Sequence, residues 1–97
     1  MDNKVIDNTF YMDFSIADEF WVEAIKDTYN RSFEWWKNDI RYMTALAITL
    51  NWKLRDYYHD GNMKVAKVYD ELWKKCDAYI LDNFEWDDLV YYYNVTD

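Results

Sequence analysis

Apolar residues recur every three or four positions over most of this chain, which is the spacing of α-helices rather than of β-strands. The pattern is clearest in the middle, where Asn38 can cap a helix and Gly61, after Asp60, can end it. The apolar stripe between them consists of Ile40, Met43, Leu46, Ala47, Leu50, Leu54 and Tyr57. It predicts a helix with one face against a core.

Two further long helices are predicted on either side of this one. Ser15 is a favourable N-cap, and the residues after it predict a helix over 15–36. Asn62 restarts the chain after Gly61, and a second stripe predicts a helix from there to about residue 82. That stripe consists of Val65, Val68, Tyr69, Leu72, Cys76, Tyr79 and Ile80. A short fourth helix is predicted near 86–93, with Trp86, Leu89, Val90 and Tyr93 as its apolar residues.

The first fourteen residues have a different pattern, in which Phe10, Met12 and Phe14 alternate with Tyr11 and Asp13. An isolated strand is not stable alone, so we expect an extended arm that packs over the helices. The sequence therefore predicts an all-α protein with an arm over 1–14 and a single bundle domain over 15–97. Short connections predict three main antiparallel helices and a short C-terminal fourth helix.

Composition points to binding rather than to catalysis. The 97 residues include ten Tyr, six Trp and five Phe, more aromatic surface than so small a domain readily buries, so we expect some rings to face a partner. One Gly and no Pro leave no Gly-rich nucleotide loop, and no nucleophile-elbow or zinc-protease motif is present. His59, the single histidine, lacks neighbours with metal-ligand spacing. We predict that the protein is not an enzyme and uses no cofactor or metal.

Charge is divided unevenly along the chain, which has a net charge of -8. Residues 1–30 hold seven acids and two bases, residues 31–76 six acids and nine bases, and residues 77–97 six acids and no base. Acidic ends repel phosphate, so we expect no direct contact with nucleic acid. They suit a protein partner with a basic surface.

A single cysteine, Cys76, lies on an apolar stripe, where a small buried side chain is expected. It cannot form an internal disulfide, which favours a reducing compartment. The N-terminal residues lack the pattern of a signal peptide, and no apolar run is long enough to span a bilayer. We therefore expect a cytoplasmic protein that does not contact the membrane.

Three carboxylates form the first candidate binding surface, which we call the acidic row. Glu19, Glu23 and Asp27 are four residues apart, so they follow one side of a helix. Like charges at this spacing destabilise a helix slightly, although Lys26 and Arg31 can compensate. The row either imitates nucleic-acid phosphates in a partner's basic groove or is an ordinary solvated helix face.

Acidic and aromatic residues near the C-terminus form the second candidate surface. We assign partner contacts to Asp87, Asp88, Tyr91 and Tyr92. Three consecutive tyrosines, 91–93, cannot all face one core because successive helical positions differ by about 100°. A partly buried cap on the bundle is the alternative.

The pair Trp35-Trp36 poses the same geometric problem at the end of the first predicted helix. One indole can enter the core while its neighbour points away. We assign partner contact to Trp36; packing beneath the N-terminal arm is the alternative.

Several short segments resemble a family of small helical proteins of unknown function from phages and prophage regions of gut-type Firmicutes and their relatives. The segments are residues 13–18 (DFSIAD), 24–29 (AIKDTY), 50–53 (LNWK) and 71–73 (ELW). The resemblance implies no catalytic residues. It implies a viral setting, in which small acidic helical proteins often inhibit host defences, including CRISPR nucleases.

The resulting hypothesis is a phage-type accessory protein in the host cytoplasm. It would bind and inhibit a host macromolecule, such as a defence nuclease, with nucleic-acid mimicry as one mechanism. The alternative is a structural or assembly protein that self-associates through its surplus aromatic residues, for example as a homodimer.

Overall fold

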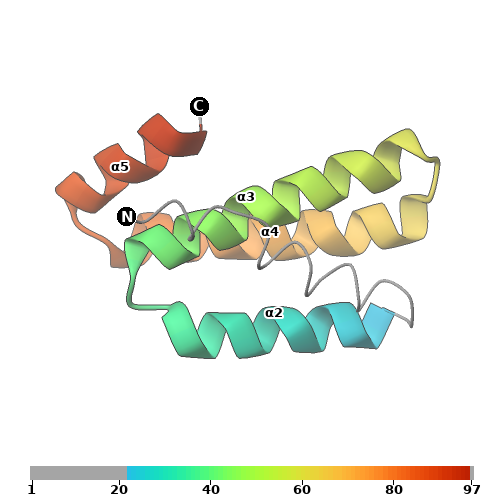
Figure 1. Ribbon diagram of the computed structural model, residues 1–97, viewed down its shortest axis with the longest axis horizontal. Helices are drawn as coiled ribbons and strands as arrows, with labels where there is room; N and C mark the ends of the chain where they lie inside the picture. The colour runs from blue at the N-terminus through green and yellow to red at the C-terminus, as the bar shows by residue number, and fades with distance from the viewer. Residues whose placement is uncertain (1–21, 97) are drawn as a thin grey trace.

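The computed structural model describes residues 22–96, which form four α-helices and no strand (Figure 1). With the labels of Figure 1, the helices are α2 (Val22–Trp36), α3 (Ile40–His59), α4 (Met63–Asn83) and α5 (Trp86–Thr96). The predicted all-α fold is confirmed. The predicted arm over 1–14 and the first turns of the first predicted helix lie outside the described residues.

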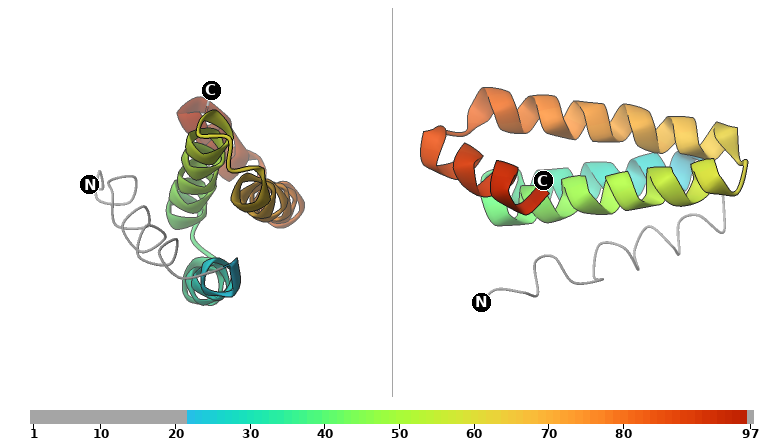
Figure 2. Two further views of the ribbon diagram at one scale, coloured as in Figure 1. Left: turned by 90° about the vertical axis from the view of Figure 1, so that its right-hand side faces the viewer. Right: turned by 90° about the horizontal axis from the view of Figure 1, so that it is seen from above.

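Consecutive helices run in opposite directions, as short connections require (Figure 1). The α3–α4 pair has the most extensive contact in the bundle, and α2 packs against both of its helices. The short helix α5 packs mainly on α3, at one end of the α3–α4 pair (Figure 2). Within residues 22–96, no helix combines the length and apolar character needed to cross a membrane.

The connections are set by three polar or flexible residues. The N-cap of α3 is Asp39, whose Oδ1 accepts a hydrogen bond of 2.9 Å from the backbone N–H of Arg41. The prediction of Asn38 as the cap was therefore wrong by one residue. At the other end of α3, Gly61 has a φ of +81°, a conformation that glycine adopts without steric cost. Asn62 caps α4 as predicted, through a 3.4 Å bond from Val65 N–H to its Oδ1.

The core is formed by one stripe from each long helix and one ring from α5. The predicted stripes of α3 and α4 are confirmed, since their central residues, among them Met43, Leu50, Tyr69 and Ile80, are fully buried. In α2 the buried side is centred on Ile25, Tyr29 and Ser32. Thr28 is buried at the edge of this side, and Ala24 is only partly buried.

Aromatic rings join the helices to one another. Phe33 of α2 meets Tyr79 of α4 edge to face, with 4.7 Å between ring centroids, and also stacks near Tyr29. At the other end of the pair, Tyr57 of α3 and Tyr69 of α4 stack at 5.9 Å. Such pairs add about 0.5–1.5 kcal/mol each beyond their buried area. Much of the aromatic content therefore serves internal packing.

Three polar groups lie deep in this core. Cys76 is buried, as predicted, and its Sγ is 3.8 Å from the carbonyl oxygen of Met43. Burial raises the pKa of the Cys76 thiol from 9.0 to about 12, with a smaller contribution from the charge of Asp77. The hydroxyl groups of Tyr29 and Thr44 are buried and make no hydrogen bond with any residue of the 22–96 segment. Their desolvation is a cost that the surrounding apolar contacts offset.

Candidate partner-binding surface

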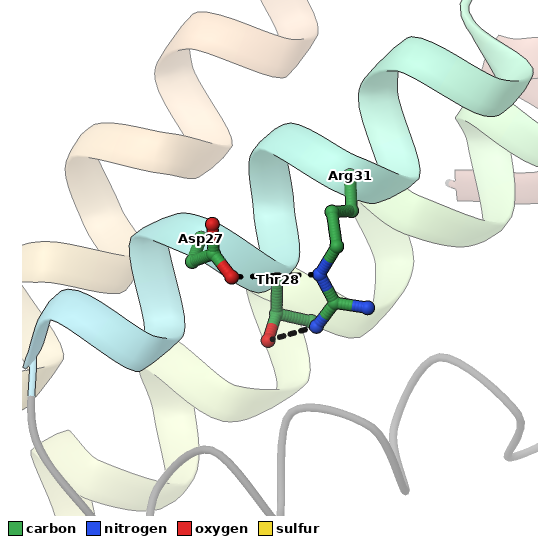
Figure 3. Close-up of polar contacts among 3 residues, drawn as sticks. All are labelled: Asp27, Thr28 and Arg31. Atoms are coloured by element: carbon green, nitrogen blue, oxygen red, sulfur yellow. Dashed lines mark hydrogen bonds and ion pairs between the residues drawn. The ribbon is translucent and has the colours of Figure 1, made fainter.

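The described part of the acidic row is exposed but partly neutralised. Glu23 and Asp27 both face solvent on α2, and Glu19 lies outside the described residues. The guanidinium of Arg31 lies 3.5 Å from the Asp27 carboxylate and also donates to Thr28 Oγ1 at 3.3 Å (Figure 3). This is the compensating pair that the spacing predicted. Over residues 22–37 three acids are matched by three bases, so this stretch of α2 has little net field.

The tryptophan pair at the end of α2 divides between core and solvent, and the assignment of a partner contact to Trp36 stays a prediction. Trp36 is partly buried and stacks on Tyr42, with centroids 5.0 Å apart and planes 13° apart. Trp35 is 72% exposed. The indole that a partner can reach most easily is therefore Trp35 rather than Trp36.

The three consecutive tyrosines also divide as the helical geometry requires. Tyr93 is exposed and Tyr91 partly so, whereas Tyr92 is buried. The assignment of Tyr92 to a contact surface is corrected, because its hydroxyl donates a 2.6 Å hydrogen bond to Asp77 Oδ1 inside the bundle. Burial, together with this bond and the charge of Asp77, raises the pKa of Tyr92. Tyr92 fastens α5 to α4.

Several acidic residues follow one another where α4 turns into α5. Asp82, Glu85 and Asp87 are exposed there, and Asp88 is partly buried. No lysine or arginine follows Lys75, so no base on the rest of α4 or on α5 balances them. Between these acids Trp86 is 71% exposed. We call Asp82, Glu85, Trp86 and Asp87 the acidic corner.

Trp86 was not among the predicted contact residues, because the prediction did not divide the apolar residues of the last helix between its two sides. The structure instead buries Tyr92 and partly buries Leu89, and it leaves Trp86, Val90 and Tyr93 exposed. Positions 89, 92 and 96 share one side of a helix, whereas 86, 90 and 93 share another. Dividing the residues of the last helix into these two sets would have shown from the sequence that Trp86 and Leu89 lie on different sides.

Neither the grooves nor the charged clusters point to catalysis or to a metal. Residues 22–96 contain no group of three His, Cys, Asp or Glu side chains placed to hold a metal ion. A groove of about 590 Å³ is lined by α3, α4 and α5, with Asp77, Arg55 and Thr96 among its polar lining residues. Asp77 is already bonded to Tyr92 there. That the protein lacks enzymatic activity and cofactors stays a prediction.

Comparison of the chain with protein-family models, with curated proteins and with solved structures found no match in any of the three. The resemblance to phage proteins therefore stays a prediction, and functional arguments rest on the surfaces described above.

Proposed function

We propose that this chain is a binding protein that attaches to a basic surface of a host macromolecule through its acidic corner and thereby inhibits it. The target we favour is a defence nuclease, in line with the resemblance to phage proteins. The observation that carries the proposal is Trp86, 71% exposed among three exposed carboxylates with no nearby base along the chain.

An exposed indole and its acidic neighbours would contribute to binding in different ways. Burying the exposed part of a tryptophan against a partner contributes about 3 kcal/mol by its area. Tryptophan is also among the residues most enriched at the energetic centres of interfaces. The carboxylates of Asp82, Glu85 and Asp87 would steer the protein towards lysine- and arginine-rich surfaces, including those that normally bind phosphate.

The acidic row has a secondary place in this proposal. Asp27 already has a cationic neighbour in Arg31, so it must share or exchange that contact to engage a partner. Glu23 is the described member of the row that is better placed for a new contact. We therefore expect charge reversal in the row to weaken binding less than charge reversal in the corner.

Capture from a bacterial lysate with matched charge variants tests the proposal. The corner variant is Glu85→Lys with Asp87→Lys, and the row variant Glu23→Lys with Asp27→Lys carries the same change in net charge. We expect wild type and the row variant to retain the same nucleic-acid-handling protein, released by moderate salt, and the corner variant to lose it. Equal retention by the corner variant, or recovery of the bait alone, would contradict the proposal.

A further inference from the structure

The helix α5 carries apolar side chains on two sides, although within residues 22–96 it has a neighbouring helix on only one of them. Its inner side, with Leu89 and Tyr92, belongs to the core. On a second side, which we call its outer side, Trp86, Val90 and Tyr93 are 71%, 37% and 47% exposed, and Tyr93, at the edge of this side, also lines the groove beside α3. Helices that are apolar on more than one side are normally covered on each of them. The outer side of α5 is thus an uncovered surface within the described structure.

A second uncovered apolar surface lies on the α3–α4 pair, the pair on which α5 packs, beyond the end of α5. It is a groove of about 520 Å³ whose apolar lining is Leu54 and Tyr58 from α3 with Met63 and Ala66 from α4. Tyr58 and Met63 are 65% and 54% exposed. We call it the α3–α4 groove. It adjoins the hollow beside α5, since Arg55 lines both.

The two surfaces have opposite charge. Arg55 and Lys67 line the groove, and neither makes an ion pair with another residue of the 22–96 segment. The one acid in the lining, Asp70, is paired with Lys74 at 3.0 Å. The outer side of α5 begins beside Glu85 and Asp87 and has no base. An acidic apolar helix is therefore the complement of this groove.

The lengths of the two surfaces also agree. The groove follows α3 from Asn51 to Tyr58, about 12 Å along the axis, and the eleven residues of α5 span about 16 Å. Seen from above, α5 covers one end of the α3–α4 pair and leaves the other end open (Figure 2). One side of the molecule thus has a raised half, formed by α5, and a hollow half of similar length, formed by the α3–α4 groove.

We propose that the α3–α4 groove binds the outer side of α5 from a second copy of this chain. A two-fold axis between the raised and hollow halves places each α5 in the groove of the other copy. Trp86, Val90 and Tyr93 then contact Tyr58 and Met63, and Asp87 or Glu85 faces Arg55 and Lys67. The contact is isologous and closes as a dimer.

This dimer goes beyond the proposed function and does not depend on it. Because both use Trp86, the dimer and the complex with a basic target exclude each other. A variant confined to the groove leaves the acidic corner intact. It therefore separates the failure of one proposal from the failure of the other.

Sedimentation equilibrium over a wide range of protein concentration tests the dimer. We expect wild type to dimerise, and both Arg55→Glu with Lys67→Glu and Glu85→Lys with Asp87→Lys to weaken dimerisation at least tenfold. The four changes together restore opposite charges across the interface and should recover most of the lost affinity. Lys26→Glu with Lys64→Glu, which alters exposed lysines outside the groove lining, is the matched charge control and should dimerise like wild type.

Three results would overturn the inference. The first is a wild-type protein that stays monomeric at every concentration. The second is an Arg55→Glu, Lys67→Glu variant that dimerises as tightly as wild type, and the third is a folded four-fold variant that remains monomeric. Circular dichroism of each variant confirms that the helices are intact. Capture of the same lysate protein by the groove variant and by wild type would show that target binding is separate from the dimer.

Discussion

The hydroxyl of Tyr92 is the polar contact that fastens the last helix to the rest of the bundle. It donates a 2.6 Å hydrogen bond to the Asp77 carboxylate, while the rest of the Tyr92 side chain is buried in the core. Hydrogen bonds to charged groups contribute more than neutral ones, and Asp77 is partly exposed, which reduces the effect. We therefore expect a small chemical change at position 92 to lower the stability of the protein more than a similar change elsewhere in α5.

We predict that Tyr92→Phe lowers the free energy of unfolding by about 1–2 kcal/mol, because the ring stays buried while the bond is lost. Urea denaturation followed by circular dichroism measures the change. Tyr91→Phe is the control, since Tyr91 makes no hydrogen bond through its hydroxyl among the described residues, and should differ from wild type by less than about 0.5 kcal/mol. Equal effects of the two substitutions would mean that the Asp77 contact adds no stability.

The raised pKa of the Cys76 thiol leads to a prediction of how the stability of the protein changes at alkaline pH. Its pKa is about 12 in the folded protein and 9.0 ordinarily, so the unfolded chain loses this proton first as the pH rises. The contribution of the buried, protonated thiol to the free energy of unfolding is fully present below pH 9 and is lost between pH 9 and 12. Over that range the free energy of unfolding falls with a slope approaching about 1.4 kcal/mol per pH unit. We predict a shallower decline for Cys76→Ala over pH 9–11 in the same urea experiment. Parallel pH profiles of the two proteins would contradict this assignment.

At the scale of the elements, the caps decide where the helices begin. Asp39 accepts from the backbone N–H of Arg41, and Asn38 is exposed and is not the cap. We predict that Asp39→Ala destabilises the protein by about 1 kcal/mol and that Asn38→Ala changes little. Thermal unfolding of the two variants side by side checks this, and a larger effect at Asn38 would restore it as the cap.

The connection between α3 and α4 depends on backbone geometry at Gly61. Its φ of +81° disfavours side chains, although a Cβ there would meet no atom within 4 Å. We predict that Gly61→Ala costs about 1–2 kcal/mol through backbone strain alone, while Gly61→Asn costs less. Equal stabilities of wild type and Gly61→Ala in urea would mean that this turn relaxes without cost.

The helices could be predicted from sequence because periodicity and turn chemistry agreed. Gly61 and Asn62 stand together between two strong stripes, so the α3–α4 connection was clear. The side of α2 that faces the core was less clear, because Tyr29 contributes its ring to the core although its hydroxyl has no hydrogen-bond partner among the described residues. A pattern built from apolar residues alone does not identify such a tyrosine as a core residue.

The candidate site was harder to predict than the fold. Spacing shows which residues share a side of a helix but not which side another helix will cover. Trp35 and Trp36 differ by one position and have opposite environments, and Tyr92 lies in the core between neighbours that are more exposed. Helical spacing separates Trp86 from Leu89, but only the packing of α5 on α3 shows which of the two sides is covered.

For the molecule as a whole, charge and exposed apolar surface are arranged around α5. The acidic corner lies at its start, its outer side is apolar, and the cationic α3–α4 groove lies beyond its end. Surfaces of this kind are typical of proteins that act by contact with other macromolecules. We therefore propose that the acidic corner, with Trp86 at its centre, is the contact surface for a basic target.

The most direct test places a photo-crosslinking amino acid at position 86 and, as a control, at Glu71, an exposed position in the middle of α4, in protein expressed in bacterial cells. We predict an adduct from position 86 with a host protein that has a basic, phosphate-binding surface, and none from position 71. Adducts with a second copy of the chain alone would support the dimer but contradict the proposed target binding. The same host adduct from both positions, or no adduct from position 86, would show that the acidic corner is not the contact surface.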